Sequence, residues 1–145
     1  MSAGEAGDGR DVHDVELVEC FPDVDAYRRL RTAAGLSAKS AEAAAGGLHG
    51  TRYGVSLVRG GETVGMGRVI GDGGCFWFVV DVAVAPALQG RGLGRRIMAA
   101  LDAWIRANAP ATAHVSLIAD GDAKHLYAKY GFAELRRAVA MAYTL

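Results

Sequence analysis

A glycine-rich hexapeptide, Gln-Gly-Arg-Gly-Leu-Gly at positions 89–94, is the part of this 145-residue sequence best suited to bind a ligand. It lies between a long apolar stretch and a run with helical spacing, so its backbone amides would sit at a helix N-terminus. Amides there point toward one spot, and the helix dipole adds roughly half a positive charge. Arg91, Arg95 and Arg96 place three cations around the loop. These residues predict a site for an anion such as a pyrophosphate.

Two common phosphate-binding motifs do not fit these residues. A Walker A loop needs Gly-x-x-x-x-Gly-Lys-Ser/Thr, and the sequence contains no such string. A dinucleotide-binding fingerprint needs glycines at its first, third and sixth positions. Counted from Gly90 or Gly92, the sixth residue is Arg95 or Ile97. A glycine-rich turn that binds nothing is the alternative, and the flanking arginines, apolar strand and amphipathic helix disfavour it.

The first half of the chain predicts two helices and a set of antiparallel strands. Residues 15–20 read as a short strand, Asp23 as the cap of a helix that ends at Gly35, and Ser40 as the cap of a second helix that stops at Gly46-Gly47. From residue 52 apolar side chains alternate, and Gly60-Gly61 fits a hairpin turn. Residues 52–85 therefore predict a three-stranded meander. Its last strand, 75–85, is apolar on both faces and is expected to be central and covered on both sides.

The second half predicts helices that alternate with strands. An amphipathic helix follows the glycine-rich loop and ends at Pro110, and residues 113–119 form a strand that a right-handed crossover makes parallel to strand 75–85. Asp122 is expected to cap a short helix that Gly131 closes, and residues 132–145 to supply one or two last strands. The predicted fold class is α+β, with a mixed, mostly antiparallel central sheet of six or seven strands and helices on both faces.

Two motifs of the sequence resemble those of one family. Gln-Gly-Arg-Gly-Leu-Gly, preceded by Asp-Val-Ala-Val-Ala-Pro, resembles the Gln/Arg-x-x-Gly-x-Gly/Ala pyrophosphate loop of the GNAT superfamily of N-acetyltransferases. Leu-Tyr-Ala-Lys-Tyr-Gly-Phe at 126–132 is similar to the family's Tyr-x-x-x-Gly-Phe. The resemblance covers about residues 14–145 and implies a GNAT-like fold with acetyl-CoA as co-substrate.

The resemblance also implies roles for individual residues. Backbone groups that contact the pantetheine arm fall on Val82, Ala83 and Val84. The pyrophosphate would bind the amides of Gln89, Gly90, Arg91, Gly92, Leu93 and Gly94, with the side chains of Arg91 and Arg95 near it. Tyr127 takes the position of the general acid. Many members carry Asn seven residues before it, where this chain has Asp120, and members with a base on the central strand place it where this chain has Phe78 and Val80.

The implied activity is transfer of an acetyl group from acetyl-CoA to a primary amine by direct attack, without a covalent intermediate. An alkylamine titrates near 10.4, so only about one molecule in two thousand is the free nucleophile at pH 7. Proton transfer from tyrosine to a free thiolate is uphill by roughly 2 kcal/mol, so Tyr127 would help mainly by hydrogen bonding to the sulfur, and a nearby helix terminus could lower its pKa. Few grouped acidic residues occur between 23 and 50, which favours a small-molecule acceptor. A non-catalytic acyl-CoA-binding module and a purely packed Tyr127 are the alternatives.

Other reactive side chains predict little further chemistry. Asp81 within the apolar strand is either a base or, more in keeping with a buried carboxylate, a paired structural residue. No two histidines have metal-ligand spacing, so no metal is expected. Cys20 and Cys75 have apolar neighbours and are expected to be buried thiols. Phe76, Trp77 and Phe78 read as core residues that could also wall an apolar acceptor pocket.

Composition excludes several classes of protein. A hydrophobic content of 51% with 22% charged residues does not fit a disordered chain, and a net charge of zero argues against a nucleic-acid partner. No stretch is long enough to cross a membrane, and the start lacks the apolar core of a signal peptide. We expect a disordered leader at residues 1–12, then a single domain from 13 to 145 in the cytoplasm. Homodimerisation stays open at this stage.

Overall fold

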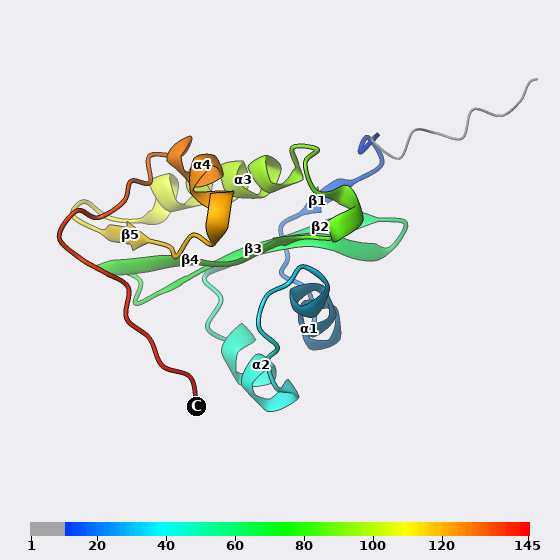
Figure 1. The fold of residues 1–145 in the computed structure, drawn as a ribbon, viewed down its shortest axis with the longest axis horizontal. Coiled ribbons are helices and arrows are strands. Elements are labelled where there is room, and N and C mark those ends of the chain that lie inside the picture. The colour runs from blue at the N-terminus through cyan, green and yellow to red at the C-terminus, as the bar shows by residue number, and fades with distance from the viewer. Residues whose placement is uncertain (1–10) are drawn as a thin grey trace, which may run out of the picture.

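The computed structural model describes residues 11–145, so most of the predicted leader lies outside the described residues. Five strands within this range form one mixed sheet in the order β1-β2-β3-β4-β5, and Figure 1 shows α1 and α2 on one face and α3 and α4 on the other. The elements are β1 (Glu16–Val18), α1 (Val24–Ala33), α2 (Ala41–Leu48), β2 (Tyr53–Arg59), β3 (Glu62–Gly71), β4 (Phe76–Val84), a 3-10 turn (Pro86–Leu88), α3 (Leu93–Asn108), β5 (His114–Ser116), a second 3-10 turn (Gly121–Ala123) and α4 (Lys124–Ala128). The predicted α+β class with helices on both faces is confirmed.

The predicted number of six or seven strands is wrong for the described part of the chain. Within residues 11–145 no strand follows β5, so residues 132–145 supply neither of the last strands expected there. The physical reason is that a strand exists only when its amides have a ladder partner. The C-terminal residues run past the sheet without pairing to it, although their side chains keep an alternating pattern.

Most of the helix ends predicted for the first half of the chain are confirmed. The Asp23 carboxylate accepts from the Ala26 amide at 2.9 Å, and the Ser40 hydroxyl accepts from the Ala43 amide at 3.0 Å, so both predicted caps are confirmed. Gly35 has the expected positive φ of +83°. Gly46-Gly47 do not stop α2, which continues to Leu48, and Asp122 caps no helix with its side chain. A glycine within a helix lowers the stability of the helix by only about 1 kcal/mol relative to alanine. A hydrogen bond from Arg68 on β3 to the Gly47 carbonyl, 3.0 Å long, helps to hold this turn in place.

The meander has the predicted turn and pairing. Gly60 and Gly61 have φ of +55° and +78°, which is the geometry of a tight two-residue hairpin turn. β4 pairs antiparallel with β3 and parallel with β5, as the crossover predicts. One face of β2, β3 and β4 packs under α3, whose Leu93, Ile97, Met98, Leu101 and Ile105 are buried. The predicted apolar stripe of α3 is therefore the main core contact.

Two burial predictions are wrong. Phe76 and Phe78 in the first half of β4 are 54% and 43% exposed, because α1 and α2 cover the sheet near Met66 and Ala83 and leave this part of the same face open. Cys20 and Cys75 are exposed as well, since each lies in a turn beside a strand end rather than within a strand. The aromatic residues on this open face are surface and not core.

A bulge in β4 is held by a buried cluster of charges. The pairing of β4 with β3 shifts between Met66 and Arg68, and opposite this shift Asp81 has a positive φ of +58°. The Asp81 carboxylate, with 5% of its side chain exposed, accepts from Arg31 Nη1, from Arg68 Nε at 2.7 Å and from the Tyr27 hydroxyl at 3.2 Å. The prediction that Asp81 is a paired structural carboxylate is confirmed.

This cluster joins three layers of the fold. Arg31 comes from α1 and also donates to the Ser37 carbonyl at 2.8 Å. Arg68 comes from β3 and also donates to the Gly47 carbonyl at 3.0 Å, which is the contact that stabilises the glycine-containing turn of α2. Asp81 is the shared acceptor, so both helices on this face are tied to the bulge. Removing its charge would leave two buried guanidinium groups facing each other.

We therefore expect Asp81→Asn to lower the free energy of unfolding by about 3 kcal/mol, the low end of the cost of breaking a buried ion pair, because the amide oxygen still accepts one hydrogen bond. Asn also tolerates positive φ, so the backbone of the bulge is not strained by the change. Urea denaturation followed by circular dichroism measures the difference. Asp14→Asn is the matched control, since Asp14 pairs with Arg59 at 2.8 Å while 69% exposed and should cost about 1 kcal/mol or less. Equal losses in the two variants would contradict the role of the cluster.

Candidate functional site

The glycine-rich loop leads directly into α3. Gly90 and Gly92 have φ of +77° and +81°, and a Cβ atom on either would meet no other atom within 4 Å. Gly92 is the N-cap of α3, and the first amide that donates back to it belongs to Arg96, at 3.1 Å. The amides of the three residues between them therefore have no partner within the helix. The space above the loop is open, as a bound anion requires.

The charges around the loop differ in their surroundings. Arg91 Nη1 is buried and has no hydrogen-bond partner among the described residues, which is costly for a guanidinium unless a ligand supplies an acceptor. Arg95 is exposed beside the loop. Arg96 instead donates to the Val15 carbonyl at 2.9 Å and so holds the chain before β1. The first turn of α3 contains no acidic residue. Of the three arginines predicted around the loop, Arg91 and Arg95 thus form no ion pair with a carboxylate within residues 11–145.

Gln89 and Leu93 have structural contacts of their own. Gln89 Nε2 donates to the Val84 carbonyl at 3.0 Å, which fastens the loop to the end of β4. The Gln89 amide donates to the Pro86 carbonyl at 3.3 Å. The Leu93 side chain is 1% exposed in the core under α3, so only its backbone faces the loop. The loop is therefore held from both ends.

Within residues 11–145, the edge of β4 that faces β5 has no strand partner beyond the first three ladder positions. β5 pairs with β4 only from Phe76 to Phe78, after which the two strands separate. The Ala85 amide donates to the Val64 carbonyl at 2.8 Å, and Ala83 lies opposite Met66. Because backbone groups alternate along a strand, Val82 and Val84 direct theirs toward the opening, while Ala83 directs its own toward β3.

Tyr127 lies on α4, and α4 is docked on the first turn of α3. The Tyr130 hydroxyl donates to the Arg95 carbonyl at 2.9 Å, and Leu126 lies 3.2 Å from where a Cβ atom of Gly94 would be. Gly94 therefore makes room for α4, whereas Gly90 and Gly92 face open space. The glycine-rich loop and Tyr127 are thus positioned by the same helical turn.

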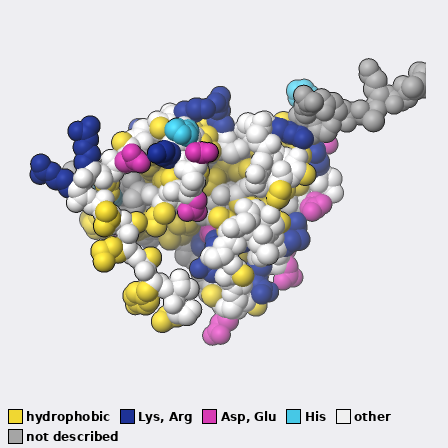
Figure 2. Space-filling model, viewed as in Figure 1, with side chains coloured by type: hydrophobic (Ala, Val, Ile, Leu, Met, Phe, Trp, Pro, Cys, Tyr) yellow, Lys and Arg dark blue, Asp and Glu magenta, His cyan; other side chains and the backbone are white. Residues whose placement is uncertain are grey.

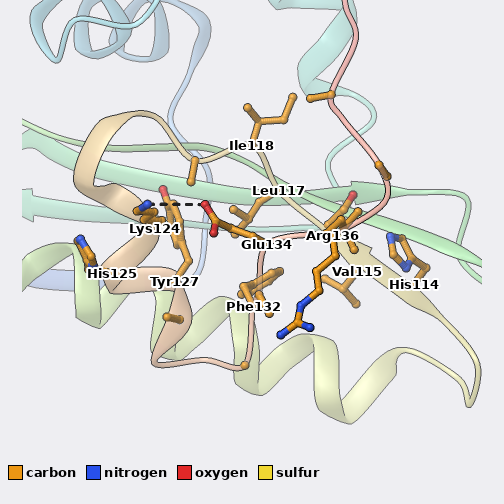
Figure 3. A pocket seen from close by; sticks show the side chains of 18 residues that line it. His114, Val115, Leu117, Ile118, Lys124, His125, Tyr127, Phe132, Glu134 and Arg136 are labelled. Atoms are coloured by element: carbon orange, nitrogen blue, oxygen red, sulfur yellow. Dashed lines mark ion pairs between the residues drawn. The ribbon is translucent and has the colours of Figure 1, made fainter.

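Tyr127 borders a hollow of about 930 Å³ between β5, α4 and residues 131–140. Figure 3 shows its ring beside Phe132, from which it is separated by 6.4 Å between centroids in an edge-on arrangement, near the Lys124–Glu134 ion pair. Burial raises the pKa of Tyr127, and the negative charge of Asp120 raises it further. The expectation that a helix terminus lowers this pKa is wrong. The hydroxyl is consequently a protonated hydrogen-bond donor at neutral pH.

Sequence reasoning missed the partners of Asp81. Arg31 follows Tyr27 by four residues and so shares its buried helical face, and Arg68 is a lone cation within an apolar strand. A cation at either of these buried positions indicates that a carboxylate lies nearby to pair with it. At Phe78 and Val80 the structure offers no titratable group, in agreement with the sequence.

Residues 11–145 contain no group of three or more histidine, cysteine or acidic side chains that could hold a metal ion. No helix in that range has the length and apolar character needed to cross a membrane.

Comparisons with known proteins address the family. A model of the acetyltransferase (GNAT) domain matches residues 51–134. A solved structure from meticillin-resistant Staphylococcus aureus, described as a protein of unknown function and probable acetyltransferase, is 37% identical, with a TM-score of 0.85 over 90% of this chain and 98% of that one. No curated protein matches the chain.

More distant structures share the fold alone. The ribosomal-protein-S18-alanine N-acetyltransferase of Escherichia coli is 19% identical, with a TM-score of 0.70 over 83% of this chain and 79% of that one. Glucosamine-6-phosphate N-acetyltransferase of Arabidopsis thaliana is 15% identical, with a TM-score of 0.66 over 90% and 97%. The family model spans more than half of the chain and the S. aureus structure nearly all of it, so the protein belongs to the GNAT family of acetyltransferases and is an acyltransferase.

Proposed function

We propose that this acetyltransferase moves the acetyl group of acetyl-CoA to a primary amine of a small molecule by direct attack. The observation that carries the proposal is the shared turn of α3, which positions both the open amides of the glycine-rich loop and the hydroxyl-bearing helix α4. The glycine-rich loop before this turn binds a phosphate-bearing substrate, and α4, which packs on the turn, holds a proton donor beside the opening between β4 and β5.

The residues of the loop fit the phosphates of coenzyme A. Arg91 Nη1 is buried without an acceptor, and the space over Gly90 and Gly92 is free for one. We assign the pyrophosphate to the amides of residues 89–94 with the cations of Arg91 and Arg95. We assign the pantetheine arm to the β4 edge at Val82, Ala83 and Val84, where the backbone groups of Val82 and the amide of Val84 face the opening while the Val84 carbonyl accepts from Gln89. When bound, acetyl-CoA supplies the acetyl thioester.

Tyr127 would assist departure of the sulfur. The amine nitrogen attacks the acetyl carbon, the bond from that carbon to sulfur breaks, and the nitrogen loses a proton to water. A tyrosine whose pKa is raised is a poorer acid than free tyrosine, so complete proton transfer to a thiolate of pKa near 8.5 costs more than the roughly 2 kcal/mol set by ordinary pKa values. A hydrogen bond from the hydroxyl to the developing negative charge does not carry that cost.

The acceptor would bind on the open half of the face that α1 and α2 cover. Phe76 and Phe78 lie exposed there and offer an apolar wall. No acidic cluster lies on α1 or α2 to grip a protein's lysine-rich tail. Structures with this fold act on acceptors as different as a ribosomal-protein alanine and a sugar phosphate, so the acceptor follows from these local residues and not from the fold.

A thiol-release assay with a panel of amines tests the activity. Amine-dependent release of coenzyme A, with the acetylated amine identified by mass spectrometry, is the expected result. Binding of acetyl-CoA without release across a broad panel would instead favour the alternative, an acyl-CoA-binding module without turnover.

The proposed pyrophosphate site is tested with two variants of Gly92 whose side chains have nearly the same shape and differ in charge. Gly92→Asp should weaken coenzyme A binding at least tenfold more than Gly92→Asn, because both side chains tolerate positive φ and only the first brings a negative charge to the amides. Calorimetry on the folded variants measures both affinities. Gly94→Asp is unsuitable, since its Cβ would lie 3.2 Å from Leu126 Cδ2 and so change packing as well as charge. Equal affinities of the two Gly92 variants would move the pyrophosphate elsewhere.

Tyr127→Phe tests the donor. Turnover at saturating substrates should fall about a hundredfold with little change in coenzyme A affinity, because the hydroxyl acts mainly in the transition state. Since the pKa of Tyr127 lies above its ordinary value of 10.0, the donor stays protonated and the ratio of wild-type to variant turnover should be constant from pH 7 to 9. Tyr53→Phe, which removes a hydroxyl bonded to Glu19 on another part of the fold, is the control. Near-wild-type turnover of Tyr127→Phe would leave the ring as packing only.

A further inference from the structure

The buried charge cluster around Asp81 carries more positive than negative charge. Arg31 and Arg68 contribute two positive charges, and Asp81 contributes one negative charge. The fourth member is the Tyr27 hydroxyl, and burial, followed by the charge of Asp81, raises the pKa of this phenol, so it stays neutral. Within residues 11–145 no second carboxylate pairs with either arginine. One net positive charge therefore remains in a site where an unbalanced charge is unfavourable.

Arg68 has one donor atom that the described part of the chain does not use. Its Nε donates to Asp81 at 2.7 Å and its Nη1 to the Gly47 carbonyl at 3.0 Å, whereas Nη2 donates to no group within residues 11–145. Arg31 differs, because each of its three nitrogen atoms donates to Ser37 or to Asp81. Only 10% of the Arg68 side chain is exposed. A donor left unused in such surroundings lowers stability unless a ligand supplies an acceptor.

The guanidinium group of Arg68 is held in a fixed orientation. Its Cζ atom lies 5.5 Å from the centre of the Phe21 ring and 5.9 Å from that of Tyr27. Nη2 lies beside α2 at Gly47, where a Cβ atom would be 3.9 Å from it. Nη2 keeps contact with solvent, unlike Arg91 Nη1, which is enclosed. The chain thus has a second oriented cation with a free donor, away from the glycine-rich loop.

The strand register places Arg68 beside an open part of β4. Arg68 pairs with Val80, and paired residues on adjacent strands have side chains on the same face of the sheet. Phe76 and Phe78 precede Val80 on this face and are exposed. On the other side of Val80 no strand lies within residues 11–145, because β5 pairs with β4 only as far as Phe78. Val80 therefore has a cation on one side, an aromatic ring at one end and, two residues further, the β4 edge at Val82. Figure 2 shows hydrophobic side chains gathered beside this end of the sheet, with Lys and Arg side chains on the α1 and α2 side.

We propose that the acceptor amine is an amino acid with an apolar side chain, whose carboxylate binds Arg68 Nη2 and whose side chain packs on Phe78. This inference rests on the proposed function, because it names the acceptor class of that same site. A carboxylate carries the single negative charge that balances the cluster, whereas a phosphate monoester would bring nearly two. The amine of an amino acid is one carbon away from the carboxylate, so binding of the carboxylate orients the nitrogen toward the thioester. That nitrogen then attacks the acetyl carbon, and the products are the N-acetyl amino acid and coenzyme A, with the amine proton lost to water.

Calorimetry with matched ligands tests the recognition of the carboxylate. L-phenylalanine should bind the wild-type chain about ten- to a hundredfold more tightly than L-phenylalaninamide, because the neutral amide oxygen makes a weaker hydrogen bond to a buried cation. L-leucine and L-leucinamide repeat the comparison with a smaller apolar side chain. Equal affinities within both pairs, or no binding of either amino acid, would overturn the proposal. Binding is measured without turnover, so its failure and the failure of acetyl transfer in the thiol-release assay are distinguishable.

Arg68→Lys tests whether the free donor is responsible. The variant keeps a positive charge beside Asp81 and lacks Nη2, so KM for L-phenylalanine should rise about tenfold while KM for L-phenylalaninamide and the affinity for acetyl-CoA stay unchanged. Arg59→Lys is the matched control, since it makes the same change at an exposed pair with Asp14 and should alter neither KM.

The two acceptors separate a binding role of Arg68 from a structural one. Circular dichroism first establishes that both lysine variants are folded. A rise in KM of equal size for the amino acid and its amide would mean that Arg68 only supports the fold, and the proposal would be rejected. If Arg68→Lys does not fold, the comparison of matched ligands on the wild-type chain decides the question by itself.

Discussion

The buried carboxylate of Asp81 is the contact on which the arrangement of the sheet and its helices depends. It lies at the bulge where β4 changes register, and it holds one arginine from α1 and one from β3. Two cations and one anion in a dry site are stable only because most of the remaining guanidinium donors reach backbone carbonyls and hydroxyls. The pairing of β4 with β5 ends at Phe78, three residues before this bulge. The charge cluster therefore stabilises the part of β4 that lies beside the gap to which we assign the thioester.

The glycine-rich loop and Tyr127 are related through packing and not through direct contact. Gly92 is the last residue of the loop and the N-cap of α3. Gly94 leaves space for the Leu126 side chain, and the Arg95 carbonyl accepts a hydrogen bond from the Tyr130 hydroxyl. Each of these contacts falls within the first turn of one helix. A substrate that spans from the loop to the opening beside β4 would therefore meet binding groups and a proton donor whose separation is set by a rigid element.

The features that depend only on residues near one another in the sequence could be predicted from it. The caps at Asp23 and Ser40, the Gly60-Gly61 turn and the stripe of α3 follow from hydrogen bonding and periodicity over a few residues. The parallel placement of β5 follows from the handedness of the connection through α3. The partners of Asp81 required knowledge of which elements pack together, and the raised pKa of Tyr127 required its burial. The exposure of Phe76 and Phe78 depends on how far α1 and α2 extend over the sheet. Residues 132–145 have a strand pattern, but a pattern cannot say whether a partner edge lies within reach.

The contact between Gly94 and Leu126 limits how this chain can diverge. A side chain at position 94 would crowd the Leu126 side chain on α4, the helix that carries Tyr127. The proposed cofactor loop and the proposed proton donor are therefore constrained by the same contact. The face that carries Phe76 and Phe78 has no such link to the loop, since it lies across the sheet from α3 and α4. If the acceptor binds there as we propose, substitutions on this face could change the acceptor without disturbing the glycine-rich loop or α4. The two faces of the sheet would then diverge at different rates, the one with Phe76 and Phe78 faster than the one with α3.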